Sequence, residues 1–229
     1  MLILGIDTSG KNASVAVYDT VKELFLGQIS VLTGMTHSQV IMPMCIEVLE
    51  KLDLTLANID KLAVASGPGS YTGLRIGLSA VQAMAFGLDC ECAGVPTLEA
   101  LAYSNIASKG IICSIMTARS DLVYTAAYES DGYCLTEIAG ECIMSHDELA
   151  TELALNGREV LLCGDGSGDF FMKYQSPLLR LASPQLRVQT AVGVCLGASV
   201  KEGVKPEDLQ ISYLQKVKAE KDLEREGLL

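Results

Sequence analysis

The chain has 229 residues, with 28 acidic and 17 basic side chains, so its formal net charge is −11. This length suits one large domain or two closely joined lobes with a sizeable core. An apolar share of 49% against 20% charged residues excludes global disorder. The acidity argues against a partner held mainly through phosphate contacts, because such binding needs a surplus of Lys and Arg on one face.

Histidines and cysteines narrow the function classes further. His37 and His146 lie far apart, so neither spacing of a histidine-rich zinc hydrolase site is present. The eight cysteines sit mostly in apolar runs without a Cys-x-x-Cys pair, which is typical of free thiols in a reducing cytoplasm. Because the start is not basic and Asp7 comes early, we expect no signal peptide. The apolar run Ile76–Leu88 is too short to span a bilayer.

Apolar periodicity in the first half predicts the order β-β-β-α-β-α-β-α. The short polar connections between the first three strands favour antiparallel neighbours. The predicted elements are strands at 2–6, 13–19 and 24–32, a helix opening at 36–39 and ending near 52, a strand at 61–66, a helix at 74–87, a strand at 90–95 and a helix at 98–107.

The second half is less regular in its pattern. A capping box, Ser145 with Glu148, marks the start of one of its helices. We place a lobe boundary after residue 106, which gives an N-terminal lobe at 1–106 and a smaller C-terminal lobe at 107–229. The charged tail from Lys216 is expected to be solvated, or helical only against a partner. The predicted elements are strands at 111–116, 122–128 and, more weakly, 134–138, a helix at 146–155, a strand at 160–163, a glycine-rich turn at 164–169 and a helix at 191–201.

The first two predicted helices are more apolar than surface helices usually are. Apolar side chains cover most of the circumference of the first, and in the second no charged residue separates Arg75 from Asp89. A helix that is apolar all round is buried on two sides. One side can be the sheet, and the other is either the C-terminal lobe or another protein chain. We favour another chain, because large apolar patches on soluble proteins usually mark partner sites. Small residues in the second helix would let another backbone come close: Gly77, Ala80, Ala83, Ala85 and Gly87.

Two turns are candidates for binding an anion. The segment Gly67–Gly73 follows a strand and opens a helix, whose N-terminus attracts negative charge. Its spacing fits neither the dinucleotide fingerprint nor the P-loop, so a structural turn is the favoured interpretation. In the other turn, Asp7 stands at a strand end, where it could hold a hydrated magnesium ion. Thr8 and Ser9 beside it could offer amides and hydroxyls to phosphate.

Taken together, four segments of the first half form a pattern that is specific enough to indicate a protein family. They are Gly5–Ser9, Thr36–Gln39 with Met42 and Pro43 behind it, Ser66–Gly77, and Gly94–Leu98. In order and spacing these segments resemble the TsaB (YeaZ) family. The second half is similar more loosely, through Ala118 and Arg119, Val123 and Tyr124, Gly164–Gly166, and Tyr213 and Leu214.

The resemblance implies a fold and a function. The fold is the α/β type of actin, sugar kinases and Hsp70 (ASKHA), with two ribonuclease-H-like lobes. The function is that of a non-catalytic scaffold subunit, required with TsaD and TsaE for threonylcarbamoyl transfer to adenosine 37 of tRNAs that read ANN codons. In this family TsaD carries the metal and the transfer chemistry, and TsaE supplies ATPase activity. The chain would be cytoplasmic, without a membrane partner, and would meet tRNA only through the complex.

The resemblance also implies two sites. TsaD, or a second copy when TsaD is absent, would dock on the first two helices. No cofactor is required, but a vestigial nucleotide site with weak ATP or ADP binding is expected at Asp7, Thr8, Ser9, Gly67 and Gly69. The expected interface residues are His37, Ile41, Met44, Cys45, Val48, Arg75, Ser79, Gln82, Ala83 and Phe86.

Departures from the family pattern bear on the alternatives. Thr117 stands where the family often has an acid that faces phosphate in related kinases, and Gln215 replaces a usual Arg. TsaD-type metal binding uses two histidines on one helix face, whereas His37 stands alone, so a glycoprotease has no support. One alternative is a small kinase or ATPase acting alone, with Asp7, both glycine-rich turns and Asp165 as its second acid. Another is a freestanding regulatory homodimer.

Overall fold

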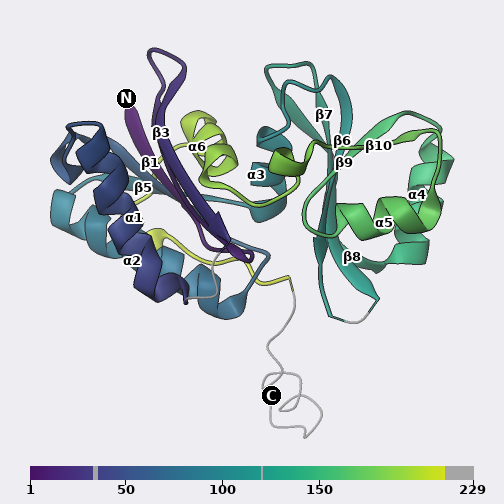
Figure 1. Ribbon diagram of the computed structural model, residues 1–229, viewed down its shortest axis with the longest axis horizontal. Coiled ribbons are helices and arrows are strands. Elements are labelled where there is room, and N and C mark those ends of the chain that lie inside the picture. The colour runs from purple at the N-terminus through teal and green to yellow at the C-terminus, as the bar shows by residue number, and fades with distance from the viewer. Residues whose placement is uncertain (33–35, 120, 215–229) are drawn as a thin grey trace, which may run out of the picture.

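The computed structural model describes residues 1–32, 36–119 and 121–214 of the chain. Two five-stranded sheets stand side by side, each with helices packed against it (Figure 1). The strands of the first sheet are β1 Leu2–Asp7, β2 Asn12–Asp19, β3 Leu24–Leu32, β4 Lys61–Ala65 and β5 Glu91–Val95; those of the second are β6 Gly110–Thr117, β7 Leu122–Ser130, β8 Leu135–Ser145, β9 Val160–Cys163 and β10 Leu179–Leu181. The helices are α1 His37–Lys51, α2 Tyr71–Leu88, α3 Thr97–Tyr103, α4 His146–Asn156, α5 Ser167–Tyr174 and α6 Ala191–Val200.

Both halves of the chain share one topology. The first sheet has the order β3-β2-β1-β4-β5, and the second has the matching order β8-β7-β6-β9-β10. In each sheet the first three strands are antiparallel and the last two run parallel to the first. Each half therefore follows β-β-β-α-β-α-β-α, which confirms the order predicted for the first half.

The two sheets exchange one helix each. Helix α3 follows the first sheet in the chain but packs against the second, where Leu98, Leu101 and Ala102 join the core around Ile112. Helix α6 comes from the end of the chain and packs against the first sheet. The two exchanged helices lie side by side between the sheets (Figure 1). The residues that α6 contributes to the core of the first sheet are Ala191, Val194, Cys195 and Ala198.

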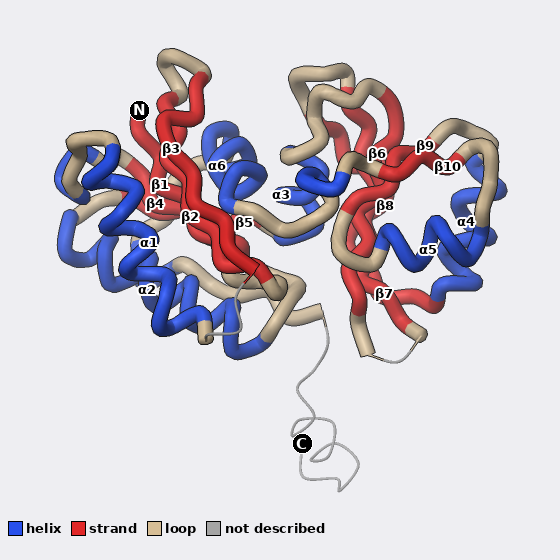
Figure 2. Tube along the Cα trace, viewed as in Figure 1, coloured by secondary structure: helices blue, strands red, loops and turns tan. Residues whose placement is uncertain are grey.

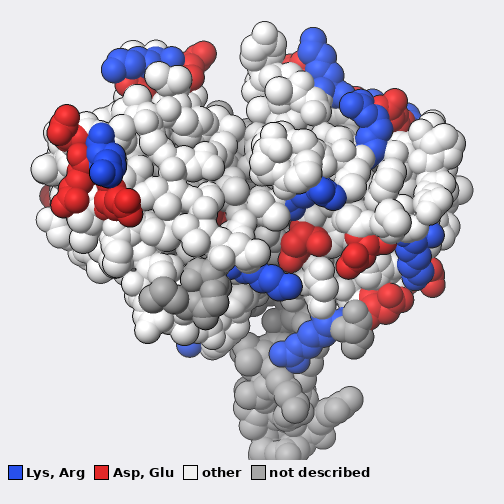
Figure 3. Space-filling model, viewed as in Figure 1, with Lys and Arg blue, Asp and Glu red and all other residues white. Residues whose placement is uncertain are grey.

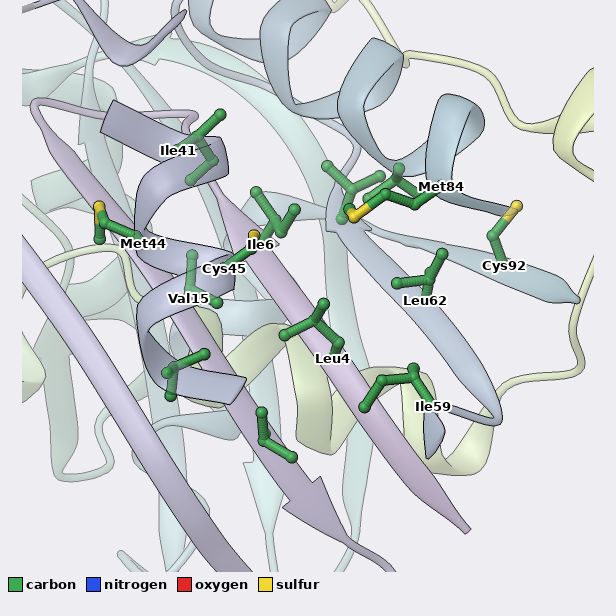
Figure 4. Packing of buried hydrophobic residues seen from close by; sticks show 14 of the residues in the cluster. Leu4, Ile6, Val15, Ile41, Met44, Cys45, Ile59, Leu62, Met84 and Cys92 are labelled. Carbon is green, nitrogen blue, oxygen red and sulfur yellow. The ribbon is translucent and has the colours of Figure 1, made fainter. Parts of the chain in front are cut away.

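The other face of the first sheet is covered by α1 and α2 (Figure 2). Under α1, the side chains of Ile41 and Cys45 lie among Leu4, Ile6 and Val15 of the central strands (Figure 4). Five side chains of α1 are buried, at a spacing of three and four residues that produces one continuous helix face. This face of α1 belongs to the core of the chain.

The chain returns to the first sheet after α6. Residues 204–214, here called the return segment, begin with a bridge in which Val204 and Cys92 exchange backbone hydrogen bonds of 2.7 and 2.9 Å. Further along, the backbone nitrogen of Ser212 donates to the carbonyl oxygen of Ser66 at 2.8 Å. The return segment thus covers the β5 edge and ends beside α2. None of the helices in the described ranges is long and apolar enough to cross a membrane.

The second half differs from its prediction in three places. The glycine-rich turn at 164–169 runs into α5, and β10 follows it; neither element was predicted, because an eight-residue helix and a three-residue strand carry little periodicity. Strand β8 extends beyond the predicted 134–138. All eight cysteines are free, as expected, and most are buried. The lobe boundary at 106 stays a prediction, and the charged tail lies outside the described residues.

Candidate functional site

A groove of about 550 Å³ separates α1 from α2 on the outer surface. Three residues of α1 and six of α2 line it, and most of them are apolar or small. Ser70 is the N-cap of α2, and its hydroxyl accepts a hydrogen bond of 3.2 Å from the backbone nitrogen of Gly73. The groove lies between the two helices that the sequence singled out. Its lining consists of Ser38, Ile41, Met42, Tyr71, Thr72, Arg75, Ile76, Ser79 and Ala80.

Eight of the ten predicted interface residues fall into two groups. Arg75, Ser79, Ala83 and Phe86 of α2 are exposed, and the Phe86 side chain keeps 61% of its surface in solvent. Four residues predicted on α1 are buried in the core instead, so the prediction that they reach a partner needs correction. Their spacing places them on the face that packs against the sheet, although Ile41 also reaches the floor of the groove. The four are Ile41, Met44, Cys45 and Val48.

The small residues of α2 lie on two sides of the helix: some face the first sheet, and others face solvent. A Cβ atom on Gly77 would stand 2.5 Å from Oγ1 of Thr8, and one on Gly73 would collide with the Thr8 carbonyl oxygen. These glycines therefore admit the backbone that follows β1, within the same chain. Nothing lies within 4 Å of a Cβ on Gly87, and Ala83 is exposed. This outer group, together with Ala80 in the groove, is available to another molecule.

Two lining residues of the groove, Tyr71 and Arg75, form a cluster with Tyr213 that the sequence did not predict. The Arg75 guanidinium lies 4.2 Å from the centre of the Tyr71 ring, and its Nε donates to the hydroxyl of Tyr213 at 3.3 Å. The two tyrosine rings are 5.5 Å apart. Gln82, predicted at the interface, donates from Nε2 to the carbonyl oxygen of Pro206 at 2.8 Å. Both contacts attach the return segment to α2, which local sequence patterns could not indicate.

The predicted nucleotide-site residues come together at the end of β1. Asp7 is buried, and its Oδ1 accepts hydrogen bonds from the backbone nitrogen and the hydroxyl of Ser9 at 2.9 and 2.6 Å. Its Oδ2 is buried and has no partner among the described residues. Burial raises the pKa of the Asp7 carboxyl above its usual range. The turn thus holds a carboxyl group whose charged form is disfavoured by lack of solvent.

The glycines of the second turn face backbone of this same chain. A Cβ on Gly69 would stand 2.5 Å from the carbonyl oxygen of Ser9. One on Gly67 would collide with the carbonyl oxygen of Ser212 in the return segment. The space beside these glycines is therefore filled by Ser9 and Ser212, which does not fit a phosphate cradle. Nucleotide binding by these residues stays a prediction.

Neither histidine belongs to a visible catalytic set. His37 begins α1, and its Nδ1 would lie 3.3 Å from a Cβ on Gly73. Nδ1 of His146 lies 3.0 Å from Oδ1 of Asp121. Across residues 1–32, 36–119 and 121–214, no three side chains among His, Cys, Asp and Glu gather closely enough to hold a metal ion.

Comparison with known proteins gives a consistent family. A family model described as TsaD, tRNA N6-adenosine threonylcarbamoyltransferase, matches residues 15–175. The Bacillus subtilis tRNA threonylcarbamoyladenosine biosynthesis protein TsaB is 32% identical over 166 residues, which is 72% of this chain and 71% of that protein. The chain belongs to the TsaB (YeaZ) family. The Escherichia coli TsaB is 36% identical over 135 residues, 57% of this chain and 56% of its own length.

TsaD proteins are related to the TsaB family as well. The Symbiobacterium thermophilum tRNA N6-adenosine threonylcarbamoyltransferase is 32% identical over 177 residues, 67% of this chain but only 51% of that protein. The match thus spans about half of the transferase. The chain is therefore similar in sequence both to TsaB proteins and to part of a protein named as a transferase.

Solved structures agree with the fold. YeaZ from Pseudomonas aeruginosa superposes with a TM-score of 0.79 at 25% identity, covering 93% of this chain and 99% of that one. The ethanolamine utilization protein EutJ from Carboxydothermus hydrogenoformans gives a TM-score of 0.51 at 12% identity, with 86% and 90% covered. The predicted fold class, an ASKHA-type α/β fold with two ribonuclease-H-like lobes, is confirmed.

Proposed function

We propose that this chain is a non-catalytic partner subunit in tRNA threonylcarbamoyladenosine biosynthesis. It would act with TsaD and TsaE in threonylcarbamoyl transfer to adenosine 37 of tRNAs that read ANN codons. Membership of the TsaB family and the names of its relatives support the pathway. A cytoplasmic location and indirect contact with tRNA follow from this role, and the net charge of −11 agrees with a subunit that leaves tRNA binding to its partners.

The open groove between α1 and α2 is the observation that carries the proposal. Ala83 follows the lining residues Ser79 and Ala80 by about one helical turn and is exposed, and the exposed ring of Phe86 lies three residues further along α2. Apolar grooves between two helices accept an amphipathic helix of a partner. Exposed aromatic side chains are frequent anchors at such interfaces. The proposed occupant is TsaD, and a second copy of this chain occupies the same surface when TsaD is absent.

The small number of histidines that could bind a metal ion supports a non-catalytic role for this chain. It contains only two histidines, His37 and His146, on helices of different sheets. His37 packs against Gly73, and His146 pairs with Asp121. A pair of histidines on one helix face would be needed for TsaD-type metal binding. The transfer chemistry is therefore assigned to TsaD, which the relatives' names describe as the transferase.

Co-purification with the cognate TsaD tests the docking surface. Ala83→Glu places a charge on the exposed side of α2, about one helical turn from the groove, where burying it against a partner is costly. Ala154→Glu puts the same change at an exposed position of α4 and serves as the matched control. We expect Ala83→Glu to lose TsaD while Ala154→Glu retains it, with unchanged circular dichroism in both. A folded Ala83→Glu variant that still captures TsaD would contradict the proposal.

Calorimetry with Mg-ATP separates this function from a kinase or ATPase that acts alone. The scaffold predicts no binding or weak binding, and no hydrolysis without partners. Micromolar affinity that is lost in Asp7→Asn would favour the enzyme, because this substitution removes the carboxylate and keeps the shape of the side chain. Thermal unfolding of the variant checks that the buried turn is intact.

A further inference from the structure

Three of the four sheet edges carry features that prevent pairing with another chain. The β5 edge is bridged by the return segment through Cys92 and Val204. Strand β8 carries Glu137 and Glu141 and two register shifts, and β10 has three residues including Arg180. Charges, irregularities and short length are the usual protections of exposed edges. The β3 edge is long and uncharged, and the one irregularity in its ladder with β2 lies near its start.

Strand β3 is long, regular over most of its length and uncharged. Its nine residues include no Lys, Arg, Asp or Glu. Leu24, Val31 and Leu32 are exposed, and Leu32 keeps 74% of its surface in solvent. Within the described residues, its backbone pairs with β2 alone. In Figure 3 charged side chains gather at the far left, over the end of α1, and few lie over the middle of β3.

We propose that the outer edge of β3 pairs antiparallel with β3 of a second copy of this chain. The irregularity in the β2–β3 ladder lies between Val17 and Tyr18, opposite the first part of β3. The segment Gly27–Leu32 beyond it is in regular register and supplies the paired edge. Because the strand is uncharged, no like charges meet in any register. The join would give one ten-stranded sheet across two copies.

Helix α1 fits this arrangement. It packs over β2 and β3, where Val48 and Leu52 lie against Gly27. Neighbouring strands are about 4.8 Å apart, and α1 lies over β2 and the space between β2 and β3, so a two-fold axis at the joined edge would place the two α1 helices about 10–15 Å apart. Closely packed helices are separated by about 8–10 Å. The strand pairing therefore brings α1 and its copy near enough for long side chains to meet.

Charges on α1 favour a second copy over an unrelated extended peptide. Figure 4 shows Met44 on the opposite side of α1 from Cys45, hence on the side of β3. Glu47 and Lys51 follow Met44 by three and seven residues, share its side of the helix and are exposed. In an antiparallel helix pair, Glu47 of one copy faces Lys51 of the other. An exposed pair of this kind contributes only about 0.2–1 kcal/mol, so it selects the partner and the register more than it adds affinity.

This surface is separate from the groove that the proposed function uses. The groove lies between α1 and α2, whereas β3 lies on the other side of α1 (Figure 2). A dimer joined through β3 leaves the groove open, so TsaD could dock on each copy. Ala83→Glu changes the exposed side of α2 and not β3, which lets the two surfaces be tested independently.

Cysteine cross-linking of the full chain tests the strand pairing. Gln28→Cys and Ser30→Cys, each in the Ala83→Glu background, are oxidised singly and as an equal mixture. Opposite residues of antiparallel strands have Cα atoms about 4.5–5.5 Å apart, which suits a disulfide. Pairing centred on residue 28, 29 or 30 therefore yields a linked dimer in one of the three samples. Thr136→Cys, exposed on the protected strand β8, is the control. No linkage above this control in any sample overturns the proposal.

A charge on the edge gives a second readout without oxidation. Val31→Lys, again with Ala83→Glu, places a charge on the joined edge, where lysine disfavours strand pairing, and Val31→Thr keeps the strand neutral. By light scattering after size exclusion, we expect the Ala83→Glu protein to be dimeric at tens of micromolar. We expect Val31→Lys to reduce the dimer at least tenfold and Val31→Thr to retain it. A monomeric Ala83→Glu protein, or a dimer indifferent to Val31→Lys, contradicts β3 pairing and leaves the TsaD test unaffected.

Discussion

The hydroxyl of Thr8 donates a hydrogen bond of 2.7 Å to the carbonyl oxygen of Gly73, and this contact joins the end of β1 to the first turn of α2. The same hydroxyl lies against Gly77, one helical turn further on. Ser9 continues the contact, since its carbonyl oxygen accepts from the backbone nitrogen of Ser70 at 2.7 Å. Two segments that look like separate binding motifs in the sequence are therefore one packed unit.

Replacing Gly77 or Gly87 of α2 by alanine should change the free energy of unfolding in opposite directions. Gly77→Ala would place its Cβ 2.5 Å from the Thr8 hydroxyl, so we expect a loss of about 1–3 kcal/mol in the free energy of unfolding. Gly87→Ala meets nothing within 4 Å and should gain about 0.5–1 kcal/mol, because alanine restricts the unfolded chain. Urea denaturation of both variants measures the difference. Equal effects at the two positions would show that α2 does not rest on Thr8.

The division of α1 and α2 into core and surface positions can be tested with two truncations. Ile41→Ala removes a side chain that is 1% exposed, so we expect a loss of about 2–5 kcal/mol in the free energy of unfolding. Phe86→Ala should change the free energy of unfolding by less than about 0.5 kcal/mol but weaken TsaD binding by about tenfold or more. Urea denaturation and titration calorimetry measure the two quantities. A Phe86→Ala variant with unchanged TsaD affinity would remove this ring from the interface.

The stability of the chain should depend on pH through Glu141. Burial, and then the nearby Glu99, raise the pKa of this carboxyl to about 7, whereas the Leu98 amide and Lys201 oppose the shift. Because the folded pKa lies above the ordinary 4.5, the contribution is fully present below about pH 4.5 and is lost as the pH rises to about 7. Glu141→Gln stays neutral and should not lose it. We expect its free energy of unfolding, relative to wild type, to rise between pH 5 and pH 8.

Urea denaturation at several pH values measures this change in relative stability. Glu50→Gln changes an exposed carboxyl on α1 that does not contribute to the Glu141 shift and is the control. An unchanged difference between Glu141→Gln and wild type from pH 5 to pH 8 would be inconsistent with a buried, protonated Glu141.

Lys61 attaches the end of α6 to the first sheet. Its Nζ donates to the carbonyl oxygens of Ala198 and Lys201 at 3.3 and 2.8 Å, and the side chain is buried. Lys61→Met leaves both oxygens without this donor, and an unsatisfied buried group costs about 1–3 kcal/mol. We expect a loss of that size in the free energy of unfolding. Lys51→Met, at an exposed position of α1, should leave it within about 0.5 kcal/mol. Similar results for both lysines would contradict the role of Lys61.

Much of the fold could be predicted because its elements have strong local patterns. The predicted strand 24–32 coincides with β3, and the predicted helix ending near 52 is α1. Helix α2 begins earlier than predicted, at Tyr71, because Ser70 caps it. What could not be predicted depends on distant residues. No local signal indicates that α6 packs against the first sheet, or that Tyr213 reaches Arg75.

The candidate site lies between the two helices that the sequence singled out, and its role in docking stays a prediction. High apolar content drew attention to α1 and α2 but did not show which of their side chains are exposed. Composition alone could not distinguish Cys45, which faces the sheet, from Ala83, which faces solvent. The glycines at 67 and 69 were open to either interpretation, since a phosphate and a chain's own carbonyl both need close backbone approach.

The exchanged helix α6 has a consequence for synthesis. One face of the first sheet, around Ile3 and Ala63, is covered only when Ala191 and Cys195 have left the ribosome. At about 5–20 residues per second, the 95 or so residues after β5 take roughly 5–20 s to make. During that time the nascent sheet exposes apolar surface that a chaperone could bind. A protein truncated before α6 should therefore aggregate rather than accumulate as a folded N-terminal half.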